Sequence, residues 1–168
     1  MHAKAILLIT LLPLLTGCLF YPVRTATPVN IRVVDAETGK PIAGAHVLRI
    51  VCDVHDLHCQ NGRIDRSQTD NEGFVKVAGE TRFGFWAPGP GGIPVPSNQI
   101  AIWKEGYYAL VFSQFGDIQY IEQSSGRKDI IEAINEIPLD RKFYGRLYDF
   151  NEVFSGGQAK LYRKIGSE

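Results

Sequence analysis

The sequence predicts an all-β domain of the β-sandwich type, and three observations support this class. Two apolar runs that alternate with polar residues lie within Val29–Ile50, on either side of a turn-rich centre. A period of two is typical of strands that bury one face. Further short apolar runs follow, separated by glycine and proline, and no long period of 3.6 residues precedes Arg141. This spacing is that of an all-β sandwich.

Residues 1–17 are predicted to be a secretory leader that lies outside the fold. Lys4 gives a positively charged start, and Ile6–Leu15 forms an apolar run that is too short to span a bilayer. The run ends in Leu15-Thr16-Gly17-Cys18, which resembles the lipobox of bacterial lipoproteins. The resemblance implies cleavage before Cys18, with lipid on the sulfur and on the new amino terminus.

Lipid on Cys18 would place the domain on a membrane surface, because each buried methylene group of an acyl chain contributes about 0.8 kcal/mol. Residue 19 is Leu, not Asp. By the sorting rule of such lipoproteins, this residue implies the outer membrane, with the domain facing the periplasm; exposure at the cell surface stays open.

Composition narrows the classes of partner. The chain has 18 Lys and Arg against 18 Asp and Glu, and nucleic-acid binding usually needs a clear basic surplus. We therefore expect no nucleic-acid partner. The chain without its leader has about 150 residues, which is one domain of ordinary size.

The domain is expected to begin at Val29. Residues 18–28 would be the lipidated Cys and an irregular tether, because the segment contains two prolines and shows no period. Val29, Ile31 and Val33 alternate with polar residues and predict the first strand, and His46–Cys52 predicts the second. The residues between them favour turns, since Gly39 can adopt positive φ. Four later runs complete the expected strands: Phe74–Ala78, Gln99–Lys104, Tyr108–Ser113 and Asp129–Leu139.

Three short motifs in this region resemble the carboxypeptidase regulatory-like family, also described as prealbumin-like or transthyretin-like. They are D-x-x-T-G-x-P-I-x-G-A-x-V from Asp35, Thr69-Asp70-x-x-Gly73-Phe74, and K-x-G-Y at Lys104–Tyr107. The resemblance covers Val29 to about Leu139. It implies a seven-stranded Greek-key β-sandwich over residues 29–140, acting as an accessory domain without catalytic residues of its own.

The densest polar cluster is CDVHDLHC, from Cys52 to Cys59. Exported cysteine pairs usually oxidise, so a disulfide that closes an exposed loop is the favoured interpretation. Zinc bound by the two cysteines with His46, His55 or His58 is an alternative, since thiolates and imidazoles are ligands that zinc prefers. Free thiols are a third. In the disulfide interpretation, His55 and His58 would be presented to a protein partner.

The segment Trp86–Pro96 is rich in proline and glycine and is too broken for a strand or helix. It is interpreted as a crossover between the two sheets, or alternatively as a recognition loop in which Trp86, Pro88 and Pro90 contact a partner, because a proline-rich backbone loses little entropy on docking.

Residues 141–168 are expected to form an amphipathic and basic tail, helical or irregular. Phe143, Leu147, Phe150 and Phe154 share one helical stripe. This stripe would cover an open edge of the sandwich or, alternatively, dock to a membrane or partner. Gly156-Gly157 is expected to detach a mobile last piece.

The sequence contains no G-x-S-x-G and no H-E-x-x-H motif, and its carboxylates are scattered. We therefore expect no enzymatic activity and no cofactor. The predicted function is that of a lipid-anchored, non-catalytic binding or structural module of the cell envelope, with an unidentified protein partner. Two alternatives stay open: an inhibitor or immunity-type protein that plugs an enzyme with its loops, and a metal-binding or hydrolytic protein that uses the histidine cluster.

Overall fold

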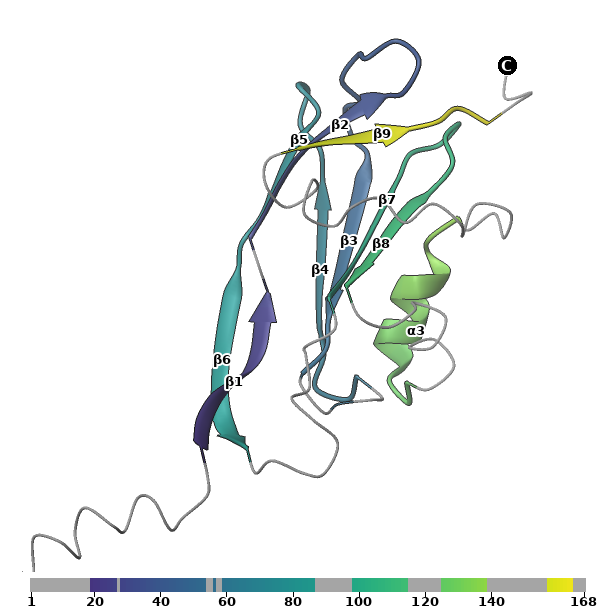
Figure 1. The fold of residues 1–168 in the computed structure, drawn as a ribbon. Coiled ribbons are helices and arrows are strands. Elements are labelled where there is room, and N and C mark those ends of the chain that lie inside the picture. The colour runs from purple at the N-terminus through teal and green to yellow at the C-terminus, as the bar shows by residue number, and fades with distance from the viewer. Residues whose placement is uncertain are drawn as a thin grey trace, which may run out of the picture.

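The computed structural model describes residues 19–26, 28–53, 56, 59–86, 98–114, 125–138 and 157–164 (Figure 1). Most of these residues lie in strands, and the described part of the chain contains one short helix, so the predicted all-β class is confirmed. The elements are β1 (Leu19–Ala26), β2 (Val29–Asp35), β3 (His46–Val51), β4 (Arg63–Gln68), β5 (Phe74–Val77), β6 (Glu80–Trp86), β7 (Asn98–Trp103), β8 (Leu110–Gln114), α3 (Lys128–Asn135) and β9 (Gln158–Leu161).

The strands form two larger sheets and one two-stranded ribbon. One sheet has the order β4-β3-β7-β8, the other has the order β5-β2-β9, and the ribbon consists of β1 and β6. All pairs are antiparallel except β2 with β9, which is parallel. The two larger sheets enclose a common core, which makes the fold sandwich-like.

This core follows from the alternation along the strands. Ile31 and Val33 of β2 are fully buried, as are Ile100 and Ile102 of β7. Side chains two residues apart share one face of a sheet, so these four mark the inner faces. Their buried neighbours in the core are Val29, Ile42, Ala45, Val47, Val75, Val77, Phe112, Ala159 and Leu161.

Helix α3 covers the outer face of the four-stranded sheet (Figure 1). Ile130, Ala133 and Ile134 of the helix are buried in one cluster with Leu48 and Ile50 of β3. Both faces of β3 are therefore covered, which explains why its sequence HVLRIV is nearly continuous in apolar residues.

The expectation of a strand over Asp129–Leu139 is wrong, because residues 128–135 form α3. The buried residues Ile130, Ala133, Ile134 and Ile137 follow the spacing i, i+3, i+4, i+7. This spacing places them on one helical face, whereas a strand would have divided them between two faces.

The connection between β2 and β3 is built from turns, as predicted. Gly39 and Gly44 have φ of 67° and 64°, a region that glycine adopts without steric cost. One carboxylate oxygen of Asp35 accepts the backbone N–H groups of Glu37 and Thr38 at 3.0 and 2.8 Å. Because β2 and β3 belong to different sheets, this connection carries the chain from one sheet to the other.

The expected irregular tether is also wrong over Leu19–Ala26, whose backbone forms β1 and pairs with β6. Only two residues separate β1 from β2, and only Ala78 and Gly79 separate β5 from β6. The β1–β6 ribbon therefore continues the β2–β5 strand pair beyond the sandwich, toward the lower left of Figure 1.

The C-terminal segment differs from the expected mobile piece. Gln158–Leu161 forms β9, which adds to the three-stranded sheet and buries Ala159 and Leu161. Arg163 follows and donates from Nε to the Asp35 carboxylate at 2.8 Å, and the Tyr107 hydroxyl donates to the same oxygen at 2.9 Å. This end of the chain is thus part of the folded domain. The amphipathic stripe over Phe143–Phe154 lies outside the described residues.

Candidate functional site: the disulfide loop and the ribbon base

Cys52 and Cys59 form a disulfide, as predicted, with Cα atoms 4.9 Å apart. Both residues are buried, and they pack with Ile130 of α3. The bridge therefore joins the loop after β3 to the core beneath the helix. Asp53 and Asp56 are the described residues within the loop.

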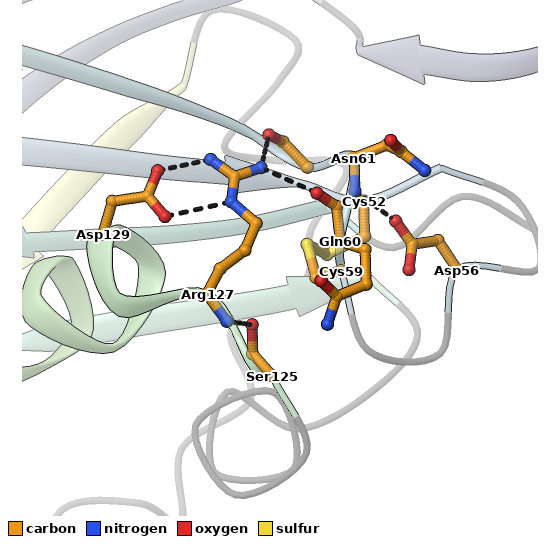
Figure 2. The surroundings of a disulfide bond; sticks show 9 residues. Cys52, Asp56, Cys59, Gln60, Asn61, Ser125, Arg127 and Asp129 are labelled. Carbon is orange, nitrogen blue, oxygen red and sulfur yellow. Dashed lines mark hydrogen bonds and ion pairs between the residues drawn. A yellow bond between two sulfur atoms is a disulfide. The ribbon is translucent and has the colours of Figure 1, made fainter.

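Arg127, the residue before α3, fixes the end of this loop (Figure 2). Its guanidinium donates to the backbone carbonyl oxygens of Gln60 and Gly62, and it pairs with the carboxylate of Asp129 in the first turn of the helix. Arg127 also holds the pKa of Asp129 below its usual value. One side chain thereby connects the disulfide loop to the helix.

Gly62 allows the loop to close this tightly. A Cβ atom at this position would lie 2.3 Å from the Cys59 sulfur and 3.3 Å from Cδ1 of Ile130. The loop is further ordered by the backbone N–H of Asn61, which donates to the Asp56 carboxylate at 2.6 Å. The backbone of residues 59–62 is therefore held by the disulfide, by the Asp56 carboxylate and by Arg127.

This arrangement argues against the zinc site considered from the sequence. The two sulfurs are bonded to each other, so no thiolates are available. His46 lies at the start of β3, whereas Cys52 follows the end of that strand. The His46 ring stacks on Trp103, with ring centroids 5.3 Å apart. No group of three metal-ligating side chains occurs among the residues that the structure describes. His55 and His58 lie outside those residues.

A buried arginine lies on β3, the strand that leads into this loop. Arg49 of β3 is fully buried, and its Nε and Nη2 atoms donate to one Asp65 carboxylate oxygen at 2.9 and 2.6 Å. Arg63 pairs with the other Asp65 oxygen at 2.7 Å and also with Glu80. From the core outward the order is Arg49, Asp65, Arg63 and Glu80, so positive and negative side chains alternate. Asp65 lies between two arginines, and Glu80 is the last residue of this series.

The same arginine fixes the base of the ribbon. Nη2 of Arg49 donates to the Ala78 carbonyl oxygen at 2.6 Å, at the point where β5 continues into β6. Glu80 is the first residue of β6 and pairs with Arg63. Two residues further on, Arg82 pairs with Asp53 of the disulfide loop at 3.3 Å. Residues of β4 and of the disulfide loop therefore hold the start of β6 in place, through Glu80 and Arg82.

Gly79 marks the junction itself. A Cβ atom there would lie 2.8 Å from Cδ of Pro28 and 2.9 Å from the carbonyl oxygen of Ala26. These contacts involve backbone and a proline ring, which cannot rotate aside. Glycine is consequently required where the two chain segments cross from the sheet into the ribbon.

The structure brings together only some of the residues predicted from the sequence. Cys52 and Cys59 meet, and Trp86 is the last residue of β6, where it pairs in register with Leu19. Cys18, Pro88 and Pro90 lie outside the described residues, as do His55 and His58. Sequence reasoning missed Arg49, Asp65 and Arg127. The available signal was Arg49 itself, a charged residue within the otherwise apolar run VLRIVC.

Comparison of the chain with known protein families, with curated proteins and with solved structures finds no match. No helix among the described residues has the length and the hydropathy that a membrane span requires.

Proposed function

We propose that this chain is a lipid-anchored protein of the bacterial cell envelope that acts as a non-catalytic binding or structural module. Lipid on Cys18 would hold it at the outer membrane with the domain facing the periplasm. The observation that carries the proposal is the sequence Leu15-Thr16-Gly17-Cys18 at the end of an apolar leader, followed directly by β1.

The domain begins one residue after the proposed anchor. Because β1 is a paired strand, the ribbon would separate the sandwich from the anchor by about 3.3 Å for each of its residues. This arrangement suits a module that presents a surface at a set height above a membrane, and a flexible tether would give no such fixed height.

We further propose that the domain is a variant of the carboxypeptidase regulatory-like sandwich. In support, residues 29–140 contribute six strands to the two larger sheets, and β9 from outside that range brings the sheets to four and three strands. The motif residues also have local backbone roles: the Thr69 hydroxyl donates to the Ile42 carbonyl at 2.6 Å and accepts the Ala45 N–H at 2.9 Å, and Gly106 of K-x-G-Y has φ of 82°. In this proposal the motifs are turn requirements, and the partner is recognised by loops.

The disulfide loop is the surface we assign to partner binding. The Cys52–Cys59 bridge joins the two ends of this loop, and Arg127 holds the carbonyl oxygen of Gln60 directly after it, so less conformational entropy would be lost on docking than from an open loop. His55 and His58 belong to this loop in the sequence and would add two titratable contacts.

Labelling with radioactive palmitate tests the anchor. The wild-type chain should incorporate label and fractionate with outer membranes, whereas Cys18→Ala should do neither. Equal labelling of the two chains, or no labelling of the wild type, would rule out lipidation at Cys18. Cys52→Ala with Cys59→Ala is the matched control, since it removes two cysteines and leaves the proposed acceptor.

Crosslinking in membranes followed by affinity purification tests the binding role. A stoichiometric envelope assembly partner that is lost when Arg127→Ala loosens the disulfide loop would support it. A single enzyme as the captured partner would instead favour the inhibitor or immunity-type function.

A further inference from the structure

We infer that the far end of the β1–β6 ribbon is a membrane seat: the rungs nearest Cys18 lie in the interfacial layer of the bilayer that holds the lipid anchor. This inference rests on the proposed anchor and adds a second contact with the same membrane, made by the protein itself.

The register of the ribbon divides it into two halves of different chemistry. The pairs nearest Cys18 are Leu19 with Trp86, Phe20 with Phe85, Tyr21 with Gly84 and Pro22 with Phe83. These rungs contain no charged residue and include five aromatic ones. After an irregularity in register between Pro22 and Arg24, the next pairs are Arg24 with Arg82, Thr25 with Thr81 and Ala26 with Glu80. The polarity therefore changes along the ribbon, from aromatic beside Cys18 to charged beside the sandwich.

This order matches the layers of a membrane surface. Trp and Tyr are enriched where hydrocarbon meets the headgroups, because their rings are partly apolar and partly polar. The four aromatic rungs extend over about 10 Å at roughly 3.3 Å per residue, comparable with the ~5–10 Å to which interfacial segments enter the headgroup boundary. The rung of Arg24 and Arg82 would then lie at the level of the headgroups, where anionic lipids attract a cation such as that of Arg24, while Arg82 stays paired with Asp53.

Two features of the ribbon suit a contact with a membrane surface. Phe83 is 53% exposed, more than any other large hydrophobic side chain that the structure describes. β1 and β6 also make their main contacts with each other and not with the two larger sheets. A lone two-stranded ribbon is marginally stable in water, so a contact at its far end would stabilise it.

The direction of the ribbon is also fixed. Arg49 holds the Ala78 carbonyl at its base, and Arg82 pairs with Asp53. The aromatic rungs therefore lie at the end of the ribbon that is away from the sandwich (Figure 1), and this end begins with Leu19, the residue after Cys18. Anchor and seat would engage one bilayer at the same time.

Two single-tryptophan chains test the seat, since Trp86 and Trp103 are the two tryptophans of the protein. Trp103→Phe leaves Trp86 as the reporter, and Trp86→Phe leaves Trp103, which stacks on His46 in the four-stranded sheet, as the matched control. Each full-length lipidated chain is placed in vesicles of phosphatidylethanolamine and phosphatidylglycerol that contain brominated acyl chains. Palmitate labelling of the same samples reports the anchor separately.

Loss of most Trp86 emission, with Trp103 emission unchanged, is the expected result. Phe83→Ser should reduce the quenching of Trp86, whereas Phe74→Ser should not, since Phe74 is also exposed but lies on β5 outside the ribbon. A palmitate-labelled chain with unquenched Trp86 would overturn the seat and leave the anchor intact. Equal quenching of both tryptophans, or equal effects of the two Phe variants, would also overturn it. Absence of palmitate label would overturn the anchor and the seat together.

Discussion

Asp65→Ala is expected to destabilise the domain more than any other removal of a charge on β4, because it leaves a buried arginine without its carboxylate. Arg49 is fully buried and directs two nitrogen atoms at one Asp65 oxygen, 2.9 and 2.6 Å away. Removing one partner of a buried ion pair costs about 3–5 kcal/mol, since the other charge is left without compensation.

The matched control is Glu136→Ala. Glu136 accepts from Arg66 of the same strand at 3.0 Å, but the two side chains are 48% and 51% exposed. An exposed pair of this kind contributes less than about 1 kcal/mol. Both substitutions remove a carboxylate that pairs with a partly exposed arginine of β4, Arg63 or Arg66, and only Asp65 also pairs with the buried Arg49. The difference between them therefore reports the buried pair.

Both variants are made in the Cys18→Ser chain, and urea unfolding gives the free energy of unfolding of each variant and of the parent chain. The double variant Arg49→Met with Asp65→Leu should recover most of the loss, because it removes both charges from the core. Hydrogen exchange adds a local readout: in Asp65→Ala the amides of β6 should exchange faster, since Arg49 also holds the Ala78 carbonyl at the ribbon base. A loss in Asp65→Ala no larger than that in Glu136→Ala would show that the buried Arg49 does not depend on the Asp65 carboxylate.

Three further predictions concern the disulfide, the acid range and the ribbon junction. Cys52→Ala with Cys59→Ala should lower the free energy of unfolding by roughly 2–3 kcal/mol in urea titrations, from the small loop that the bridge closes; no change would contradict a structural role. Arg163 and the Thr38 backbone hold the pKa of Asp35 well below its usual range, so the folded state binds this proton less tightly than the unfolded state. Stability should therefore fall as the pH decreases below about 4, and Asp35→Asn should weaken that dependence in melting curves; an unchanged slope would count against it. Gly79→Ala should speed hydrogen exchange in β1 and β6 but not in β3 and β7, because its Cβ would meet backbone at the junction; equal protection in all four strands would show that the junction tolerates a side chain.

Local patterns in the sequence predict five of the seven strands of the two larger sheets, and β4 and β9 were not predicted. Val29, Ile31 and Val33 alternate with polar residues, and the inner face of β2 follows this alternation. Gly39 was predictable as a turn residue because positive φ is a local requirement. The disulfide was predictable from two nearby cysteines in a chain with a predicted secretory leader. Each of these inferences depends on residues close together in the sequence.

All the errors except that at α3 arise where distant parts of the chain decide the structure. β9 has only four residues, and its parallel pairing with β2 joins segments more than a hundred residues apart. β1 resembles a tether because Pro22 interrupts it, yet pairing with β6 makes it a strand. Arg49 is charged within an apolar run, and its burial depends on Asp65 and Ala78 from other strands. The helical spacing around Ile130 was visible in the sequence and was misread as a strand.

Intact and peptide mass spectrometry of the protein purified from membranes tests the central claim most directly. We expect a chain that lacks residues 1–17 and whose N-terminal peptide begins at Cys18 with acyl groups attached. A chain that retains the leader, or an N-terminal peptide with unmodified Cys18, would contradict it.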